Sequence, residues 1–143
     1  MQPIVCATRG GEVSRRTQER AIALANERNT KLIFLCVVDP SFAKLVDESL
    51  AATLADELQR MGESLLSIAQ ARARKQGVVA QTAVLHGPAR QNIEKYVRKV
   101  DAGALVIGTP RTDTTPHAFG SGSVNHLVEA IHKNTGVEIV VVT

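Results

Sequence analysis

Residues 104–124 read ALVIGTPRTDTTPHAFGSGSV and decide the fold class of this chain. The first four of them are a short apolar run, which predicts a strand that is covered on both faces. Apolar residues then recur at helical spacing over residues 124–132, and Gly122 and Ser123 form the turn that opens this helix. A helix start exposes backbone N–H groups and the positive end of the helix dipole, so the stretch predicts a cradle for an anion.

The same alternation of strand and helix extends outward through the chain. Apolar runs of strand length lie at residues 4–8, 31–38, 78–85, 104–107 and 137–142. Helical patterns fill the gaps, at residues 14–29, 43–77, 88–100 and 124–132. This alternation favours a parallel sheet, because each crossover returns the next strand in the same direction. We therefore expect one α/β domain over residues 1–143, with a doubly wound five-stranded parallel sheet and helices on both faces.

Local signals also predict where the helices begin and which face they bury. Ser14 is predicted to cap the first helix, and Pro88 suits the first turn of the third. The long second helix carries an apolar stripe at steps of three and four residues, formed by Val46, Leu50, Leu54, Leu58, Met61, Leu65 and Ile68. We expect this stripe to cover the sheet; the alternative is a coiled-coil surface for a partner.

Composition and charge argue against several classes of function. The 143 residues are 44% hydrophobic and 22% charged, which is typical of a globular domain. The net charge of +3 is spread along the chain and only 3% of residues are aromatic, so we expect no nucleic-acid binding. The chain shows no secretion signal and no apolar run of membrane-spanning length, so we expect a cytoplasmic protein without membrane contact. Cys6 and Cys36 lie in strand-like runs and are expected to be buried, reduced thiols.

Three loops are expected to meet at the carboxyl edge of the sheet. They are residues 8–13, 38–40 and 108–121, which follow the first, second and fourth strands. In doubly wound sheets ligands bind at this edge, at the point where the strand order reverses. The third loop is long for a compact domain, which favours a ligand lid over a plain surface excursion.

Six segments carry a pattern that extends over essentially the whole chain. They are Ile4-Val5-Cys6-Ala7, Val37-Val38-Asp39-Pro40, His86-Gly87-Pro88, Ala104-Leu105-Val106-Ile107-Gly108, Gly122-Ser123-Val124 and the terminal run at residues 137–142. In this order and spacing the chain resembles the universal stress protein family. The resemblance implies that the five parallel strands lie in the order 3-2-1-4-5.

The resemblance also implies a set of nucleotide-binding positions. Members of the family that bind ATP hold it with Gly-x-x-Gly, nine further residues, and then Gly-Ser or Gly-Thr. Gly108, Gly122, Ser123 and Val124 match these positions, and Val38 matches more loosely as a backbone contact to adenine. Ser123 would contact phosphate through its hydroxyl group; the alternative is that it serves only as an N-cap.

Two positions depart from the family pattern. Arg111 stands in place of the second glycine, with ten residues before Gly122, and Thr8 stands where nucleotide-binding members usually carry an aspartate. Arg111 can restore a lost contact by pairing with phosphate, or its side chain can obstruct the phosphate path. A charge-assisted hydrogen bond is worth about 1.5–3 kcal/mol, so these two positions decide whether nucleotide binds.

Two functions follow from the resemblance. The first is a universal-stress-type protein that binds an adenine nucleotide, ATP or AMP, as a regulatory ligand, with Mg²⁺ only if ATP binds. The second is a nucleotide-independent dimeric adaptor in the stress response that acts through contacts with an unknown protein partner. The sequence has no P-loop, no dinucleotide fingerprint and no convincing base to activate water, so we expect at most slow ATPase activity and no catalytic residue or metal site. The apolar run at residues 137–142 is expected to lie at the sheet edge and to pair with a second copy.

Overall fold

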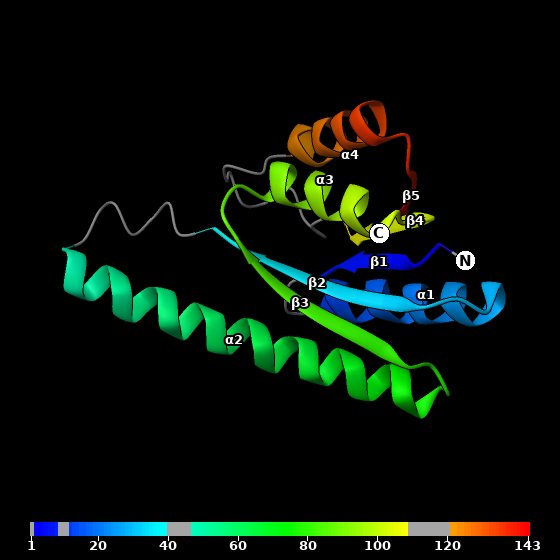
Figure 1. Cartoon of the computed structure of the whole chain (residues 1–143), viewed down its shortest axis with the longest axis horizontal. Coiled ribbons are helices and arrows are strands. Elements are labelled where there is room, and N and C mark those ends of the chain that lie inside the picture. Colours follow the sequence, from blue (N-terminus) through cyan, green and yellow to red (C-terminus); the bar gives the residue numbers. More distant parts are fainter. Residues whose placement is uncertain (1, 9–11, 40–46, 109–120) are drawn as a thin grey trace.

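The computed structural model describes residues 2–8, 12–39, 47–108 and 121–143. In these residues five parallel strands form one sheet: β1 (Ile4–Ala7), β2 (Leu32–Val38), β3 (Ala80–His86), β4 (Ala104–Gly108) and β5 (Glu138–Val142). The helices between them are α1 (Glu12–Arg28), α2 (Glu48–Lys75), α3 (Ala89–Val100) and α4 (Ser121–Thr135). The strand order is β3-β2-β1-β4-β5 (Figure 1), so the predicted fold class and strand order are confirmed.

The helices cover the sheet on both faces, with α1 and α2 on one face and α3 and α4 on the other (Figure 1). Side chains alternate along β1: Ile4 and Cys6 pack with α1 and α2, whereas Val5 packs with α3 and α4. The central strands are apolar at nearly every position because both of their faces are buried. These strands could therefore be found in the sequence as continuous apolar runs.

The start of α2 is fixed by a residue that the sequence analysis did not single out. Asp47 has an extended backbone, and its carboxylate accepts a hydrogen bond from the Leu50 N–H at 2.9 Å. This bond, together with one from the Ser49 hydroxyl, lowers the pKa of Asp47. The helix that was expected from about residue 43 therefore begins at Glu48, and residues 40–46 lie outside the described part of the chain.

The two other predicted helix starts also need correction. α1 begins at Glu12, so Ser14 lies in the first turn of the helix, where it is buried, and does not cap it. Pro88 has an extended backbone and occupies the cap position immediately before α3. Proline is tolerated both at the cap position and in the first helical turn, because the N–H groups at a helix start have no intrahelical partner to lose.

None of the described residues in the α2 stripe that was expected to cover the sheet is buried, so this prediction is wrong; Leu54, Leu58 and Leu65 are half-buried. Leu50, Met61 and Ile68 are 46%, 59% and 50% exposed. The helix buries a row of mostly small residues in its second half: Gly62, Leu66, Ala69 and Ala73. A Cβ atom added at Gly62 would lie 3.6 Å from side chains of β2 and β3, so the small residues bring α2 close to the sheet.

Gly62→Ala is expected to raise the free energy of unfolding by about 0.5–1 kcal/mol. Glycine inside a helix destabilises it by about this amount relative to alanine, because glycine is more flexible in the unfolded chain. The added methyl group would meet Cys36 Sγ and Val84 at 3.6 Å, which is an ordinary contact distance. Urea denaturation followed by circular dichroism measures the change.

Gly77→Ala is the matched control, because the same substitution is expected to lower the free energy of unfolding there. Gly77 follows α2 with φ at +79°, and no atom lies within 4 Å of an added Cβ. Backbone strain alone should then lower stability by about 1–2 kcal/mol. A lower free energy of unfolding in Gly62→Ala would show that the space between α2 and the sheet is too small for the added methyl group.

The two cysteines are buried and free, as expected. The Cys6 thiol donates a weak hydrogen bond to the Thr17 carbonyl oxygen, and burial raises its pKa. A buried, protonated thiol is a poor nucleophile, so Cys6 is part of the core rather than of a reactive site. Within the described ranges, no helix has both the length and the apolar character that a membrane crossing requires.

Candidate functional site

The reversal in strand order lies beside β1. From β1 the chain builds β2 and β3 on one side, and then crosses over to place β4 and β5 on the other. The register aligns Ala7 with both Leu35 and Ile107, so the carboxyl ends of β2, β1 and β4 lie side by side. Such a reversal opens a crevice outside the carboxyl ends of the strands, where doubly wound proteins bind their ligands.

Three predicted site residues lie at these strand ends. Thr8 follows β1, Val38 ends β2 and Gly108 ends β4. Thr8 and Val38 are buried, and Gly108 is half-buried. The Val38 carbonyl oxygen accepts a hydrogen bond from the Gly87 N–H at 2.9 Å, and such an oxygen has a second lone pair for another donor. The structure therefore brings Thr8, Val38 and Gly108 to one edge of the sheet.

Three more predicted residues belong to the first turn of α4. The helix begins at Ser121, so Gly122, Ser123 and Val124 are its next residues, and Ser123 does not hold the N-cap position. Figure 1 shows that α4 begins at the end of the molecule toward which the strands point. First-turn N–H groups have no intrahelical partner and can donate to an anion. Arg111 and the predicted lid, apart from its two ends, lie outside the described residues.

A buried polar network holds Thr8 in place. The Gln18 amide nitrogen donates to the Thr8 hydroxyl oxygen at 3.0 Å, and the Arg72 guanidinium donates to the Gln18 amide oxygen at 2.7 Å. Thr8 and Gln18 are both buried. Through these two hydrogen bonds, α1 and α2 are connected to the residue that follows β1. Sequence reasoning missed Gln18 and Arg72, because residues 54 positions apart leave no local pattern.

Gln18→Leu is expected to lower the free energy of unfolding by about 1–3 kcal/mol, because it leaves the buried Thr8 hydroxyl and Arg72 without their partner. Urea denaturation measures the loss. Gln91→Leu, at an exposed position on α3, is the control and should stay within about 0.5 kcal/mol of the wild type. Equal effects of the two substitutions would mean that the network does not contribute to stability.

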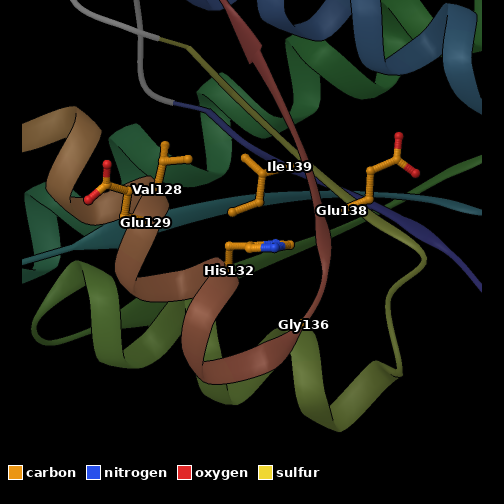
Figure 2. Close-up of a pocket in the computed structure, with 6 residues that line it drawn as sticks. All are labelled: Val128, Glu129, His132, Gly136, Glu138 and Ile139. Atoms are coloured by element: carbon orange, nitrogen blue, oxygen red, sulfur yellow. The ribbon is translucent and has the colours of Figure 1, made fainter.

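A shallow cleft of about 530 Å³ lies away from this edge, between α4 and β5. It is lined by Val128, Glu129, His132, Gly136, Glu138 and Ile139 (Figure 2). His132 Nδ1 donates to the Val137 carbonyl oxygen at 2.9 Å, while the two carboxylates point away from the ring (Figure 2). In the part of the chain that the structure describes, no cluster of three or more His, Cys, Asp or Glu side chains could hold a metal ion. The cleft is thus a feature of the β5 edge and not part of the predicted site.

Comparison with known proteins finds similarity over the whole chain. The model of the family described as the universal stress protein family matches residues 1–142. Universal stress protein MJ0531 of Methanocaldococcus jannaschii is 28% identical over 141 residues, which make up 97% of this chain and 80% of that protein.

Solved structures share the fold. The universal stress protein UspA from Lactobacillus plantarum is 16% identical with a TM-score of 0.80, and the match covers 99% of this chain and 97% of that chain. The universal stress protein from Archaeoglobus fulgidus in complex with dAMP is 20% identical with a TM-score of 0.70, and the match covers 100% of this chain and 98% of that chain.

Proposed function

Because the chain belongs to the universal stress protein family, we propose that it binds an adenine nucleotide, ATP or AMP, as a regulatory ligand. The observation that carries the proposal is the alignment of Thr8, Val38 and Gly108 at the reversal of strand order. The first turn of α4 begins toward the same end of the molecule (Figure 1). The dAMP complex of the Archaeoglobus fulgidus protein supports adenine as the base.

Backbone groups would make most of the contacts. The N–H groups of Gly122, Ser123 and Val124 would donate to phosphate at the positive end of the α4 dipole. Gly108 has no side chain and would let the ribose approach the end of β4, while the backbone of Val38 would contact adenine. Mg²⁺ would accompany the phosphates only when ATP binds.

Thr8 and Arg111 would set the strength of binding. The Thr8 hydroxyl oxygen accepts from Gln18, and in the proposed complex its hydrogen would be donated to a ribose oxygen, whereas an aspartate at this position could only accept. Arg111 would pair with phosphate through its guanidinium group. The two departures from the family pattern would therefore exchange one set of polar contacts for another.

We expect hydrolysis of ATP to be slow or absent. A base that activates water must lie within hydrogen-bond reach of it. Two side chains near the strand ends could in principle act as this base. His86, at the end of β3, is hydrogen-bonded to Gln59 on α2, and Asp39 is exposed after β2, so we assign this role to neither. A phosphate-release assay should detect no more than slow turnover, and rapid turnover would contradict a regulatory role for the nucleotide.

Thermal unfolding with AMP, with ATP and Mg²⁺, and with GTP tests this function. A ligand at 100 times its Kd stabilises the native state by about 2.7 kcal/mol, so saturating AMP or ATP should raise the Tm by several degrees. GTP at the same concentration should raise it less. An unchanged Tm with both adenine nucleotides at millimolar concentration would count against the proposal.

We also propose that β5 joins two copies of the chain into a homodimer. β5 is an edge strand of the sheet, and its Val141 is 42% exposed. The unpaired backbone groups of such an edge can form hydrogen bonds with a second edge strand. Arg28 on α1 donates two hydrogen bonds of 3.0 Å to the carboxylate of Glu138, the first residue of β5.

Val141→Lys is expected to weaken this dimer at least tenfold, because the ammonium group must be desolvated at the interface. Val79→Lys is the control, since Val79 is 87% exposed just before β3 at the other edge of the sheet. Sedimentation velocity across a dilution series measures both. A folded Val141→Lys variant that dissociates no more readily than the control would rule out pairing through β5.

The second candidate function is a nucleotide-independent adaptor that acts through protein contacts. The apolar side chains of Leu50, Met61 and Ile68 on α2 favour it, because the fold leaves them exposed. With either function, we propose a cytoplasmic protein of the stress response that does not bind nucleic acid.

A further inference from the structure

The buried polar network behind the candidate site leads from α2 to the end of β1. Arg72 on α2 donates to the Gln18 amide oxygen at 2.7 Å, and the Gln18 amide nitrogen donates to the Thr8 hydroxyl oxygen at 3.0 Å. Thr8 and Gln18 are only 3% and 4% exposed, and Arg72 is half-buried. Water has little access to such groups, so each side chain must take the bonds that its neighbours offer.

The direction of each hydrogen bond is set from the Arg72 end of the network. A guanidinium group has donors only, so it must meet the oxygen of the Gln18 amide and not the nitrogen. The amide nitrogen, which donates, therefore faces Thr8. The Thr8 hydroxyl oxygen accepts this bond, and the hydroxyl hydrogen points away from Gln18.

The opposite orientation of the Gln18 amide is strongly disfavoured. It would place the amide nitrogen against the Arg72 guanidinium, so that two donors face each other and the bond to the charged group is lost. Hydrogen bonds to charged groups are stronger than bonds between neutral groups, and a buried group without its partner is costly. Arg72 thus controls, through Gln18, the direction in which the Thr8 hydroxyl can donate.

Thr8 is the residue at which this network reaches the carboxyl edge of the sheet. Its N–H donates to the Leu35 carbonyl oxygen at 2.8 Å, which continues the contact of β1 with β2 by one residue. Ala7, just before it, is aligned with Leu35 and Ile107 at the reversal of strand order. Gln18 and Arg72 belong to α1 and α2 and would act on a ligand only through Thr8.

We propose that Gln18, oriented by Arg72, is a positioning residue that makes the Thr8 hydroxyl a donor to a ribose hydroxyl oxygen, an inference that rests on the proposed nucleotide function. A carboxylate in place of Thr8 would only accept, so the ribose hydroxyl would have to donate to it. In this chain the bond would run the other way, because the Thr8 oxygen already accepts from Gln18. The network would therefore give the site a preference for a ribose substituent that accepts.

Gln18→Glu reverses the direction of the network without removing a partner. A carboxylate at this position accepts from Arg72 and also from the Thr8 hydroxyl, whose hydrogen is then no longer directed at the ribose. Thr8 would meet the ribose through its oxygen lone pairs alone. Gln81→Glu is the matched control, because it makes the same change at an exposed position near the start of β3.

Competitive binding of AMP and two analogues tests the inference. In the analogues, fluorine replaces either the 2′ or the 3′ hydroxyl of the ribose, so that this position accepts weakly and cannot donate. A hydroxyl suits either direction of the bond, whereas fluorine suits only a Thr8 that donates. For one analogue, the ratio of its Kd to that of AMP should be about fivefold higher or more in Gln18→Glu than in the wild type and in Gln81→Glu. The added charge weakens AMP and the analogues alike, so it cancels in this ratio.

Equal ratios in the wild type and in Gln18→Glu for both analogues would overturn the inference, while AMP binding by the wild type would leave the proposed function standing. A wild type that does not bind AMP would refute the proposed function and the inference together. If circular dichroism shows that Gln18→Glu is unfolded, Thr8→Asp takes its place. A carboxylate there accepts from Gln18 and can only accept from the ribose, so the ratio should rise in the same direction, and an unchanged ratio would again overturn the inference.

Discussion

Gly122→Val is expected to weaken adenine-nucleotide binding about a hundredfold, or by about 2.7 kcal/mol. Gly122 is the second residue of α4, in the turn whose N–H groups would donate to phosphate. A branched side chain there would occupy space that phosphate needs in order to approach the backbone, whereas glycine adds no side-chain atom. Equilibrium binding of a fluorescent AMP analogue measures the loss.

The substitution should leave the fold intact, because valine costs only a few tenths of a kcal/mol more than alanine in a helix. Circular dichroism checks this. Gly62→Ala is the control for binding, since Gly62 packs against β2 and β3 beneath α2 and should keep the wild-type affinity. If Gly122→Val binds as tightly as Gly62→Ala, the nucleotide site lies elsewhere on the molecule.

Leu105→Ala is expected to lower the free energy of unfolding by about 3–5 kcal/mol. Leu105 is fully buried in β4, between β1 and β5, and packs beneath α3 and α4. Truncation removes apolar contacts and leaves a cavity that the surrounding strands can close only in part. The Tm should fall by about 10 °C or more.

Leu50→Ala is the same substitution at an exposed position in the first half of α2, and it should change stability by no more than about 0.5 kcal/mol. Chemical denaturation of the two variants side by side gives the comparison. A large loss in Leu50→Ala would mean that the stripe is covered in the folded chain, and a small loss in Leu105→Ala would contradict the core position of β4.

The strands could be predicted because their burial is visible in sequence. In β2, Leu32–Val38 is apolar throughout, and every predicted strand lies within two residues of the observed one at each end. A strand that is covered on both faces needs apolar residues at every position, so it leaves a signal that does not depend on its neighbours.

The buried face of α2 could not be predicted in this way. Its sequence carries two apolar rows: the leucine stripe, and the smaller row that includes Gly62 and Ala69. Spacing alone favours the bulkier row, whereas close packing against the sheet selects the smaller one. The choice depends on the distance between helix and sheet, which no local pattern contains.

Sequence reasoning could place the candidate-site residues whose positions follow from the chain topology. It missed the side chains that are far apart in sequence and meet only in the fold. The carboxyl edge formed by Thr8, Val38 and Gly108 follows from the strand order. The Gln18–Arg72 hydrogen bond joins two helices and has no sequence signature. Asp47 did have one, an aspartate followed by glutamate before a helical pattern, which the longer apolar stripe beginning at Val46 obscured.

Calorimetric titration of nucleotide-stripped protein with AMP, and with ATP and Mg²⁺, tests the central claim most directly. The proposed contacts of the first turn of α4 with phosphate, and of the strand ends with the nucleoside, predict saturable binding in the micromolar range, which corresponds to about −8.2 kcal/mol. Absence of binding up to millimolar concentrations of both nucleotides would contradict the claim and favour the adaptor function.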